Sequence, residues 1–150
     1  MVEIRASGER LIAAPADRVY GYLADYREHH PRILPPAFTA LRIEAGGVGA
    51  GTVFSLRMRV GGRTRASRMQ VTEPAPGRVL VESDLGSDLV TTFTVAPEGR
   101  ASRVRIETRW TAPGGPAGLI ERLFAPRVLR RLYADELARL DAYAREQGPG

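Results

Sequence analysis

The order of its parts constrains the fold of this chain more than any single motif. Residues 3–13 alternate between two faces with a period of two, which predicts a strand. Pro15 opens a short helix over residues 15–25, and a histidine-bearing helix or turn follows over residues 26–34. About six more alternating runs come next, and one long amphipathic helix closes the chain over residues 116–147. A sheet that buries one face against a single helix curves around it. We therefore expect a hollow between the two layers, suited to a small apolar ligand.

Turn-forming residues divide the middle of the chain into strands. The strands are expected over residues 37–45, 50–60, 63–73, 78–84, 88–96 and 102–111. The breaks between them are Gly46-Gly47, Gly61-Gly62, Pro74-Ala75-Pro76-Gly77, Leu85-Gly86-Ser87 and Pro97-Glu98-Gly99. Gaps this short join neighbouring antiparallel strands as hairpins. The prediction is an α+β protein with a seven-stranded curved antiparallel sheet, two short helices after the first strand, and a long C-terminal helix.

The C-terminal helix is apolar along one stripe and charged on the other side. The stripe comprises Leu119, Ile120, Leu123, Phe124, Leu129, Leu132, Tyr133, Leu137, Leu140 and Tyr143. We expect the whole stripe to face the core, with a kink or a new helical segment at Pro126. At about 1.5 Å per residue this helix is roughly 45 Å long, which a flat sheet would not need and a curled sheet can use.

Composition excludes several classes of protein. With 150 residues, the chain is expected to form one domain over residues 1–150 and to bury a core without a metal or a disulfide. It has no cysteine, which excludes disulfides and thiolate metal sites and fits a cytoplasmic location. The N-terminus lacks the apolar segment of a signal peptide, and no run is long enough for stable membrane insertion.

The positive charge of the chain does not indicate a nucleic-acid partner. The formal net charge is +5, and all 22 basic residues are arginines. A nucleic-acid-binding protein concentrates its arginines on one helix or loop, often with aromatic residues for stacking. Here the arginines are spread over strands and helices among 17 acidic residues, so we ascribe them to coding bias and expect no nucleic acid.

The turn Gly61-Gly62 predicts the register of its hairpin. As a two-residue loop, it pairs Met58 with Arg65 and places both on one face of the sheet. Arg65 is therefore expected to point inward with the apolar residues of that face, which are Phe54, Leu56, Val60 and Met69.

The next turn, over residues 74–77, brings two carboxylates to the same face. As a four-residue loop, it sets Glu82 opposite Met69 and Asp84 opposite Ser67. Arg65, Glu82 and Asp84 would then form a polar cluster in an apolar wall, the usual makeup of a small-molecule site. Two alternatives stay open: a one-residue bulge would turn both carboxylates outward, or all three residues form a surface ion network at the strand ends.

The same alternation gives the rest of the cavity wall. The predicted ligand-binding residues are Phe54, Leu56, Met58, Met69, Thr91, Phe93, Ile106, Thr108, Leu129 and Tyr133. No group of residues has the spacing of metal ligands, and the sequence has no cofactor motif, so neither metal nor cofactor is expected. His29 and His30 could supply a general base at the pocket mouth, or they could cap the turn before Pro31.

Four local patterns resemble those of one superfamily. They are Ala14-Pro15 followed by Val19-Tyr20, Leu23-Ala24-Asp25-Tyr26, the proline-turn hairpin of residues 71–80, and the last hairpin of residues 93–104. Over nearly all of residues 3–145 the chain resembles the START-like (SRPBCC) superfamily, the polyketide cyclase/dehydratase and lipid-transport group. The resemblance implies a helix-grip fold, with a cavity between the sheet and the C-terminal helix. Members include lipid and quinone carriers, hormone receptors, aromatic polyketide cyclases and chaperone activators.

The sequence therefore predicts binding or carriage of a small hydrophobic molecule, such as a lipid, a quinone or a polyketide-like compound. One alternative is a polyketide cyclase or dehydratase, in which Arg65 would stabilise an enolate and Glu82 or Asp84 would move protons. Another alternative is a protein-interaction module with a vestigial cavity. Inward carboxylates beside Arg65 favour the enzyme, an entirely apolar wall favours the carrier, and a filled cavity with an exposed apolar patch favours the interaction module. The oligomeric state stays open.

Overall fold

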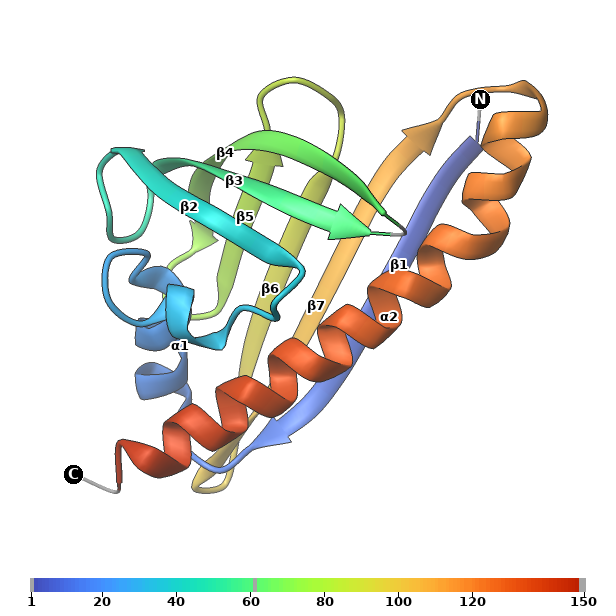
Figure 1. Ribbon diagram of the computed structural model, residues 1–150. Helices are drawn as coiled ribbons and strands as arrows, with labels where there is room; N and C mark the ends of the chain where they lie inside the picture. Colours follow the sequence, from blue (N-terminus) through green and yellow to red (C-terminus); the bar gives the residue numbers. More distant parts are fainter. Residues whose placement is uncertain (1, 61, 149–150) are drawn as a thin grey trace.

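The computed structural model describes residues 2–60 and 62–148, and its elements follow the expected order (Figure 1). Strand β1 (Val2–Ile12) leads to helix α1 (Ala16–Ala24) and to the short 3₁₀ helix η1 (His30–Ile33). The strands that follow are β2 (Phe38–Ala45), β3 (Val53–Val60), β4 (Arg63–Ala75), β5 (Val79–Asp84), β6 (Val90–Glu98) and β7 (Ala101–Ala112). Helix α2 (Gly115–Glu146) runs without a break, with Pro126 inside it.

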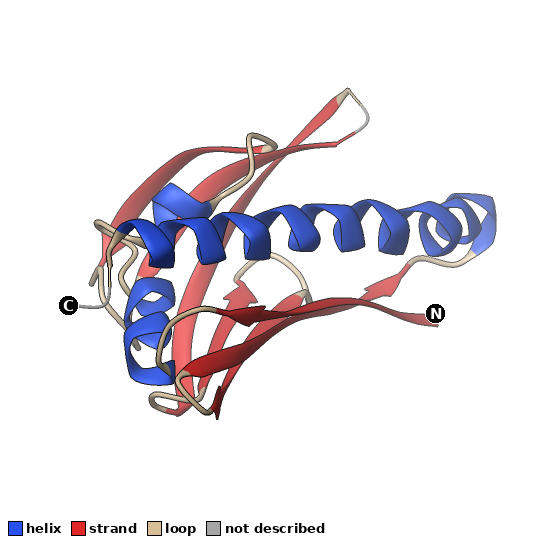
Figure 2. Cartoon of the chain, turned by 90° about the horizontal axis from the view of Figure 1, so that it is seen from below, coloured by secondary structure: helices blue, strands red, loops and turns tan. Residues whose placement is uncertain are grey.

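The seven strands form one antiparallel sheet in the order β1-β7-β6-β5-β4-β3-β2. The sheet curves, α2 lies along its concave side, and α1 and η1 close one end (Figures 1 and 2). This arrangement is the helix-grip fold that the sequence predicts. No helix among the described residues is long and apolar enough to cross a membrane.

The β3–β4 hairpin has the predicted register. Met58 pairs with Arg65 across the glycine turn, and Phe54 on the same face is buried. The arginines that alternate with these residues on β3 are exposed, so the two faces are the predicted ones. Gly61 and the side chain of Val60 lie outside the described residues.

The register of β4 against β5 differs from the prediction by two residues. Asp84 lies opposite Met69, and Glu82 lies opposite Val71, whereas the sequence predicts Ser67 and Met69 as their partners. An even displacement preserves the face of every side chain, because side chains alternate along a strand. Both carboxylates therefore keep the predicted face but acquire different neighbours.

Two local irregularities between β4 and β5 cause this displacement. The loop has three residues instead of four, since Ala75 pairs with Val79 and Gly77 has a φ of 85°, the left-handed conformation that such loops require. A bulge between Thr72 and Ala75 then adds one unpaired residue to β4. Either change alone would turn the carboxylates outward, and together they restore the inward face.

Helix α2 is buried mainly along its C-terminal half. Leu137 and Leu140 are 1% and 0% exposed. The prediction that the apolar stripe faces the core throughout is wrong for the first turns, where the side chains are 53–59% exposed at Leu119, Ile120, Leu123 and Phe124. At about 100° per residue, Leu119 stands five full turns before Leu137 and points to the same side of the helix, so its exposure shows that no other layer covers that side over the first turns.

Two contacts fix α2 against the β1 side of the sheet. A Cβ atom at Gly8 would lie 3.1 Å from the Cβ atom of Tyr133, so the missing side chain allows the helix to pack closely at this point. Further along the helix, the Asp141 carboxylate accepts a hydrogen bond of 2.9 Å from the backbone N–H of Ala13. The helix position that carries Tyr133 is therefore set by the sheet beneath it.

Candidate functional site

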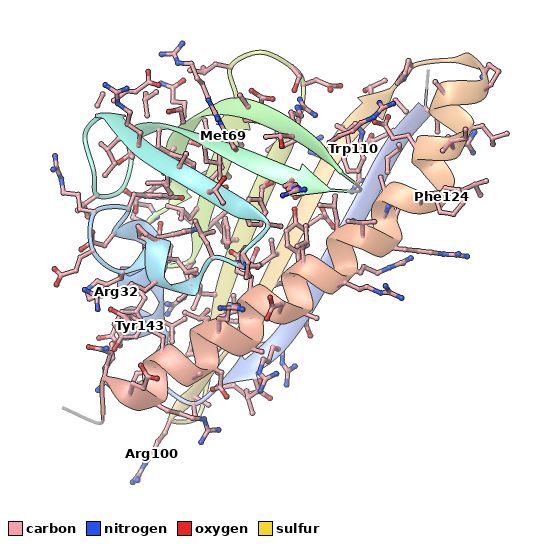
Figure 3. The ribbon with its side chains drawn as sticks, viewed as in Figure 1. Arg32, Met69, Arg100, Trp110, Phe124 and Tyr143 are labelled. Atoms are coloured by element: carbon pink, nitrogen blue, oxygen red, sulfur yellow. The ribbon has the colours of Figure 1, made fainter. Side chains whose placement is uncertain are left out.

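A cavity of about 200 Å³ lies between the concave face of the sheet and α2. Most of its wall is apolar and consists of Leu34, Phe38, Leu41, Phe54, Leu56, Met58, Met69, Leu89, Phe93, Trp110, Ala125, Val128 and Leu129. Trp110 is the one tryptophan of the chain and comes from β7, while Met69 comes from β4 (Figure 3). The wall thus draws on strands at both sides of the sheet as well as on the helix.

Most of the predicted ligand-binding residues line this cavity. They are Phe54, Leu56, Met58, Met69, Thr91, Phe93, Thr108, Leu129 and Tyr133. Ile106 is not among the lining residues; it is 1% exposed and pairs with Phe93 within the core. Contact of these residues with a ligand stays a prediction.

Glu82 is the central polar group of the cavity. It is 9% exposed, and its carboxylate accepts a hydrogen bond of 2.6 Å from the hydroxyl of Tyr26. Burial raises the pKa of Glu82 from its ordinary value of 4.5 to about 7, and the hydrogen bond from Tyr26 opposes part of that rise. At neutral pH this carboxyl group is therefore close to half protonated, and it can both donate and accept a proton.

His30 lies beside Glu82 as a neutral imidazole. Its Nδ1 atom lies 2.7 Å from the backbone carbonyl oxygen of Leu23, so Nδ1 carries the proton and donates it to that oxygen. Burial lowers the pKa of His30 to about 4. Its Nε2 atom is 3.9 Å from the Glu82 carboxylate, and the ring stacks on Tyr26 at a centroid distance of 4.5 Å. The pair is therefore not an ion pair at neutral pH.

Glu136 adds a second buried carboxyl group to the cavity. It is 4% exposed, lines the cavity from α2, and accepts no hydrogen bond from any residue in the described part of the chain. Burial, and next the nearby charge of Glu82, raise its pKa well above the usual range. Glu121 also lines the cavity, and its buried Oε2 atom has no hydrogen-bond partner among the described residues.

A chain of hydroxyl groups lies on the same wall. The Oγ1 atoms of Thr91 and Thr108 are 2.7 Å apart, and Thr108 also forms a hydrogen bond with the hydroxyl of Tyr133. All three residues line the cavity and are buried. Burial raises the pKa of Tyr133 well above its usual value, so this hydroxyl keeps its proton and can donate it to a ligand.

The predicted cluster of Arg65, Glu82 and Asp84 does not form as a unit. Arg65 lines the cavity, but its side chain is 51% exposed, and it bonds to Asp84 at 3.1 Å and to Ser87 at 3.4 Å. Arg65 lies near the end of its strand, and its exposed pair with Asp84 corresponds to the alternative of a surface ion network at the strand ends. Asp84 is held by Arg65 and Ser87 and does not line the cavity, whereas Glu82 lines it and bonds to Tyr26.

The two histidines lie in different parts of the structure. His30 lines the cavity, while the Nδ1 atom of His29 lies 2.5 Å from the hydroxyl oxygen of Tyr143, away from the lining residues. His29, Asp25 and Glu28 bring three potential ligand atoms within 4.8 Å of one another, although the sequence predicts no metal site. Asp25 accepts backbone hydrogen bonds of 3.0 Å from two following residues. These bonds account for the arrangement without a cation.

Sequence reasoning missed Glu136 as a cavity residue and Tyr26 as the partner of Glu82. Glu136 stands three residues after Tyr133 and one before Leu137, so a charged residue interrupts the apolar stripe of α2. That interruption was a usable signal for a buried carboxyl group. The spacing of Tyr26 matches the apolar face of the first helix, and nothing in the sequence indicates that its hydroxyl bonds to Glu82.

Comparison with known proteins assigns the chain to a family. The sequence profile described as polyketide cyclase/dehydrase and lipid transport matches residues 3–145. The chain belongs to this family. The START-like resemblance predicted from the sequence is thereby confirmed. A search among curated proteins found no match.

Solved structures of other proteins share the fold. The NMR structure of the KanY protein is 34% identical in sequence, with a TM-score of 0.85, and the match covers 97% of this chain and 99% of that chain. The Zhui aromatase/cyclase from a Streptomyces species is 17% identical, with a TM-score of 0.75 and coverage of 99% and 100%. Norcoclaurine synthase from Thalictrum flavum, solved with dopamine and hydroxybenzaldehyde, is 17% identical, with a TM-score of 0.73 and coverage of 99% and 90%. At this identity, the last two show a shared fold alone.

Proposed function

We propose that the protein binds a small, largely apolar molecule that carries one hydrogen-bond acceptor, such as a carbonyl group. The observation that carries this proposal is the composition of the cavity wall, which is mostly apolar, holds a buried group of carboxyl, hydroxyl and imidazole side chains, and has Arg65 at its rim. Apolar walls with a few convergent polar groups are typical of small-molecule sites. The family, whose description includes lipid transport, supports the same function.

The polar groups suit an acceptor on the ligand because they hold protons. Glu82 at a pKa of about 7, and Glu136 with its still unpaired carboxyl group, carry protons for part or all of the time at neutral pH. The hydroxyl of Tyr133 adds a further donor. A ligand oxygen placed among them would accept a hydrogen bond from the protonated Glu136 carboxyl group, which has no hydrogen-bond partner among the described residues.

Binding of a neutral apolar fluorophore, such as a phenylnaphthylamine, tests the binding function. We expect its fluorescence to rise with the wild-type protein and to be lost in Met58→Trp, because the larger side chain fills the cavity. Val48→Trp is the matched control, since Val48 is 61% exposed and does not line the cavity. Equal fluorophore binding by both variants would refute the proposed pocket. Native mass spectrometry of the purified protein would identify a retained ligand.

A second candidate is a cyclase or dehydratase, and the two buried carboxyl groups favour it. In a dehydration, one carboxylate takes a proton from the carbon next to a carbonyl group, and a carboxylic acid gives a proton to the departing hydroxyl, which leaves as water. Glu82 and Glu136 could share these roles because both sit in the cavity with raised pKa values. The family description also includes cyclases and dehydrases.

The variant Glu82→Gln separates the two candidates. The amide oxygen of glutamine still accepts the hydrogen bond of Tyr26, so we expect fluorophore binding to persist. If the protein is an enzyme, turnover of a β-hydroxy aryl ketone should fall at least roughly 100-fold, the usual scale of general acid–base catalysis. No turnover by the wild type, or turnover unchanged in the variant, would reject catalysis by Glu82 and leave the binding function standing.

A further inference from the structure

The outward side of the first turns of α2 is apolar and exposed. Exposure is 53%, 59%, 55% and 56% for Leu119, Ile120, Leu123 and Phe124, respectively. At about 100° per residue these side chains share one side of the helix. Figure 3 shows Phe124 pointing away from the sheet. Single exposed apolar residues are ordinary on a protein surface, but a contiguous group of four large ones marks an interaction site.

Arginines continue the same side of the helix toward the C-terminus. Arg127, Arg130 and Arg131 follow at a spacing that keeps them in line with the apolar residues. All three are exposed, and none makes an ion pair or a hydrogen bond with a described residue. We call this set the docking face; it comprises Leu119, Ile120, Leu123, Phe124, Arg127, Arg130 and Arg131.

The docking face is separate from the cavity. The opposite side of the same turns contributes Glu121, Ala125 and Val128 to the cavity wall, so one helix stands between the two. Glu121 is also the only acidic residue over residues 115–131 of the sequence. The outward side of this segment is therefore apolar and positively charged, with no negative charge to balance it.

We propose that the docking face attaches the protein reversibly to an anionic lipid surface. The apolar side chains enter the boundary between headgroups and acyl chains, and the arginines meet the lipid phosphates. A second copy of the chain fits this face poorly, because a symmetric contact would bring the arginines of both copies together. The face is too short for stable membrane insertion, in keeping with the sequence analysis. The inference does not depend on what the cavity binds.

Sedimentation of the full chain with vesicles tests this inference. Vesicles of phosphatidylcholine mixed with phosphatidylserine are compared with vesicles of phosphatidylcholine alone. We expect binding to the mixed vesicles only, and we expect that binding to weaken as salt rises. Each arginine near an anionic surface contributes roughly a five-fold factor, so the triple variant Arg127→Gln, Arg130→Gln and Arg131→Gln should bind roughly 100-fold more weakly. The double variant Leu123→Ser and Phe124→Ser should bind at least roughly ten-fold more weakly.

A matched control removes charge elsewhere on the surface. Arg57 and Arg59 are exposed on β3, and Arg57→Gln with Arg59→Gln should leave vesicle binding nearly unchanged. All substituted side chains are exposed, so each variant should melt at the wild-type temperature in circular dichroism. Equal binding to both vesicle types, or equal loss in the control and in the triple variant, would overturn the proposal. Self-association without vesicle binding, abolished by Leu123→Ser and Phe124→Ser, would overturn it in favour of a second copy.

Discussion

Replacing Glu82 by glutamine should change how the stability of the protein depends on pH. Burial raises the pKa of Glu82 from 4.5 to about 7, so the folded state favours the protonated form. The resulting stabilisation is fully present below pH 4.5 and is lost as the pH rises toward about 7. At about 1.4 kcal/mol per pKa unit, the loss amounts to about 3 kcal/mol.

His30 has the opposite effect over nearly the same interval. Its pKa is lowered from 6.5 to about 4 by burial, so its contribution is present above pH 6.5 and is lost as the pH falls toward about 4. The two groups largely cancel in the wild type. Glu82→Gln removes one side of this balance, and it also removes the charge that helps to raise the pKa of Glu136. The variant should therefore gain about 3 kcal/mol relative to wild type between about pH 4.5 and about pH 8.

Urea unfolding at a series of pH values measures this difference. The matched control is Glu107→Gln, which removes a carboxylate on the other face of the sheet, where Glu107 lies 2.7 Å from Arg105. His30→Gln should show the reverse trend, with its stability relative to wild type falling as the pH rises. If the free-energy difference between Glu82→Gln and wild type is the same at about pH 5 and about pH 8, Glu82 is not desolvated in the cavity and the reasoning fails.

Two further predictions concern the cavity rim and the long helix. Arg65→Met should cost no more than about 1 kcal/mol in urea unfolding because the side chain is 51% exposed, and a loss several times that of Arg57→Met would contradict its placement at the rim. Leu140→Ala should cost about 2–5 kcal/mol because Leu140 is fully buried, whereas Leu123→Ala should cost less than about 0.5 kcal/mol. Similar losses for the two leucine variants would mean that the first turns of α2 pack as tightly as its end.

The sequence was sufficient for the fold and for one register, because both depend on local signals. A glycine pair between alternating runs leaves one favourable loop, and the pairing of Met58 with Arg65 follows from it. The hairpin around Pro74 offers no such unique solution, since a three-residue loop with a bulge and a four-residue loop both suit its composition. The face of Glu82 was nevertheless predicted correctly, because two departures from the simple register cancelled.

The polar interior of the cavity could be predicted only in part. Alternation places Glu82, Thr91 and Thr108 inward, but it does not reveal which groups on α2 or η1 meet them. Contacts such as Tyr26 with Glu82 join residues far apart in the chain, and they depend on how the closing helices dock. The exposed start of α2 was misassigned for a related reason. Helical spacing shows that residues share a side, but it does not show whether another layer covers that side.

The position of Trp110 makes the unmodified protein its own optical reporter. It is the only indole in the chain, it is partly buried, and it lines the cavity. Its emission therefore comes from one known place, and a molecule that enters the cavity changes the polarity and quenching around that ring. Candidate ligands can be titrated by intrinsic fluorescence with no dye, tag or substitution. Because the chain has no cysteine, a single engineered thiol on α2 could carry an energy-transfer acceptor and report its distance from the same ring.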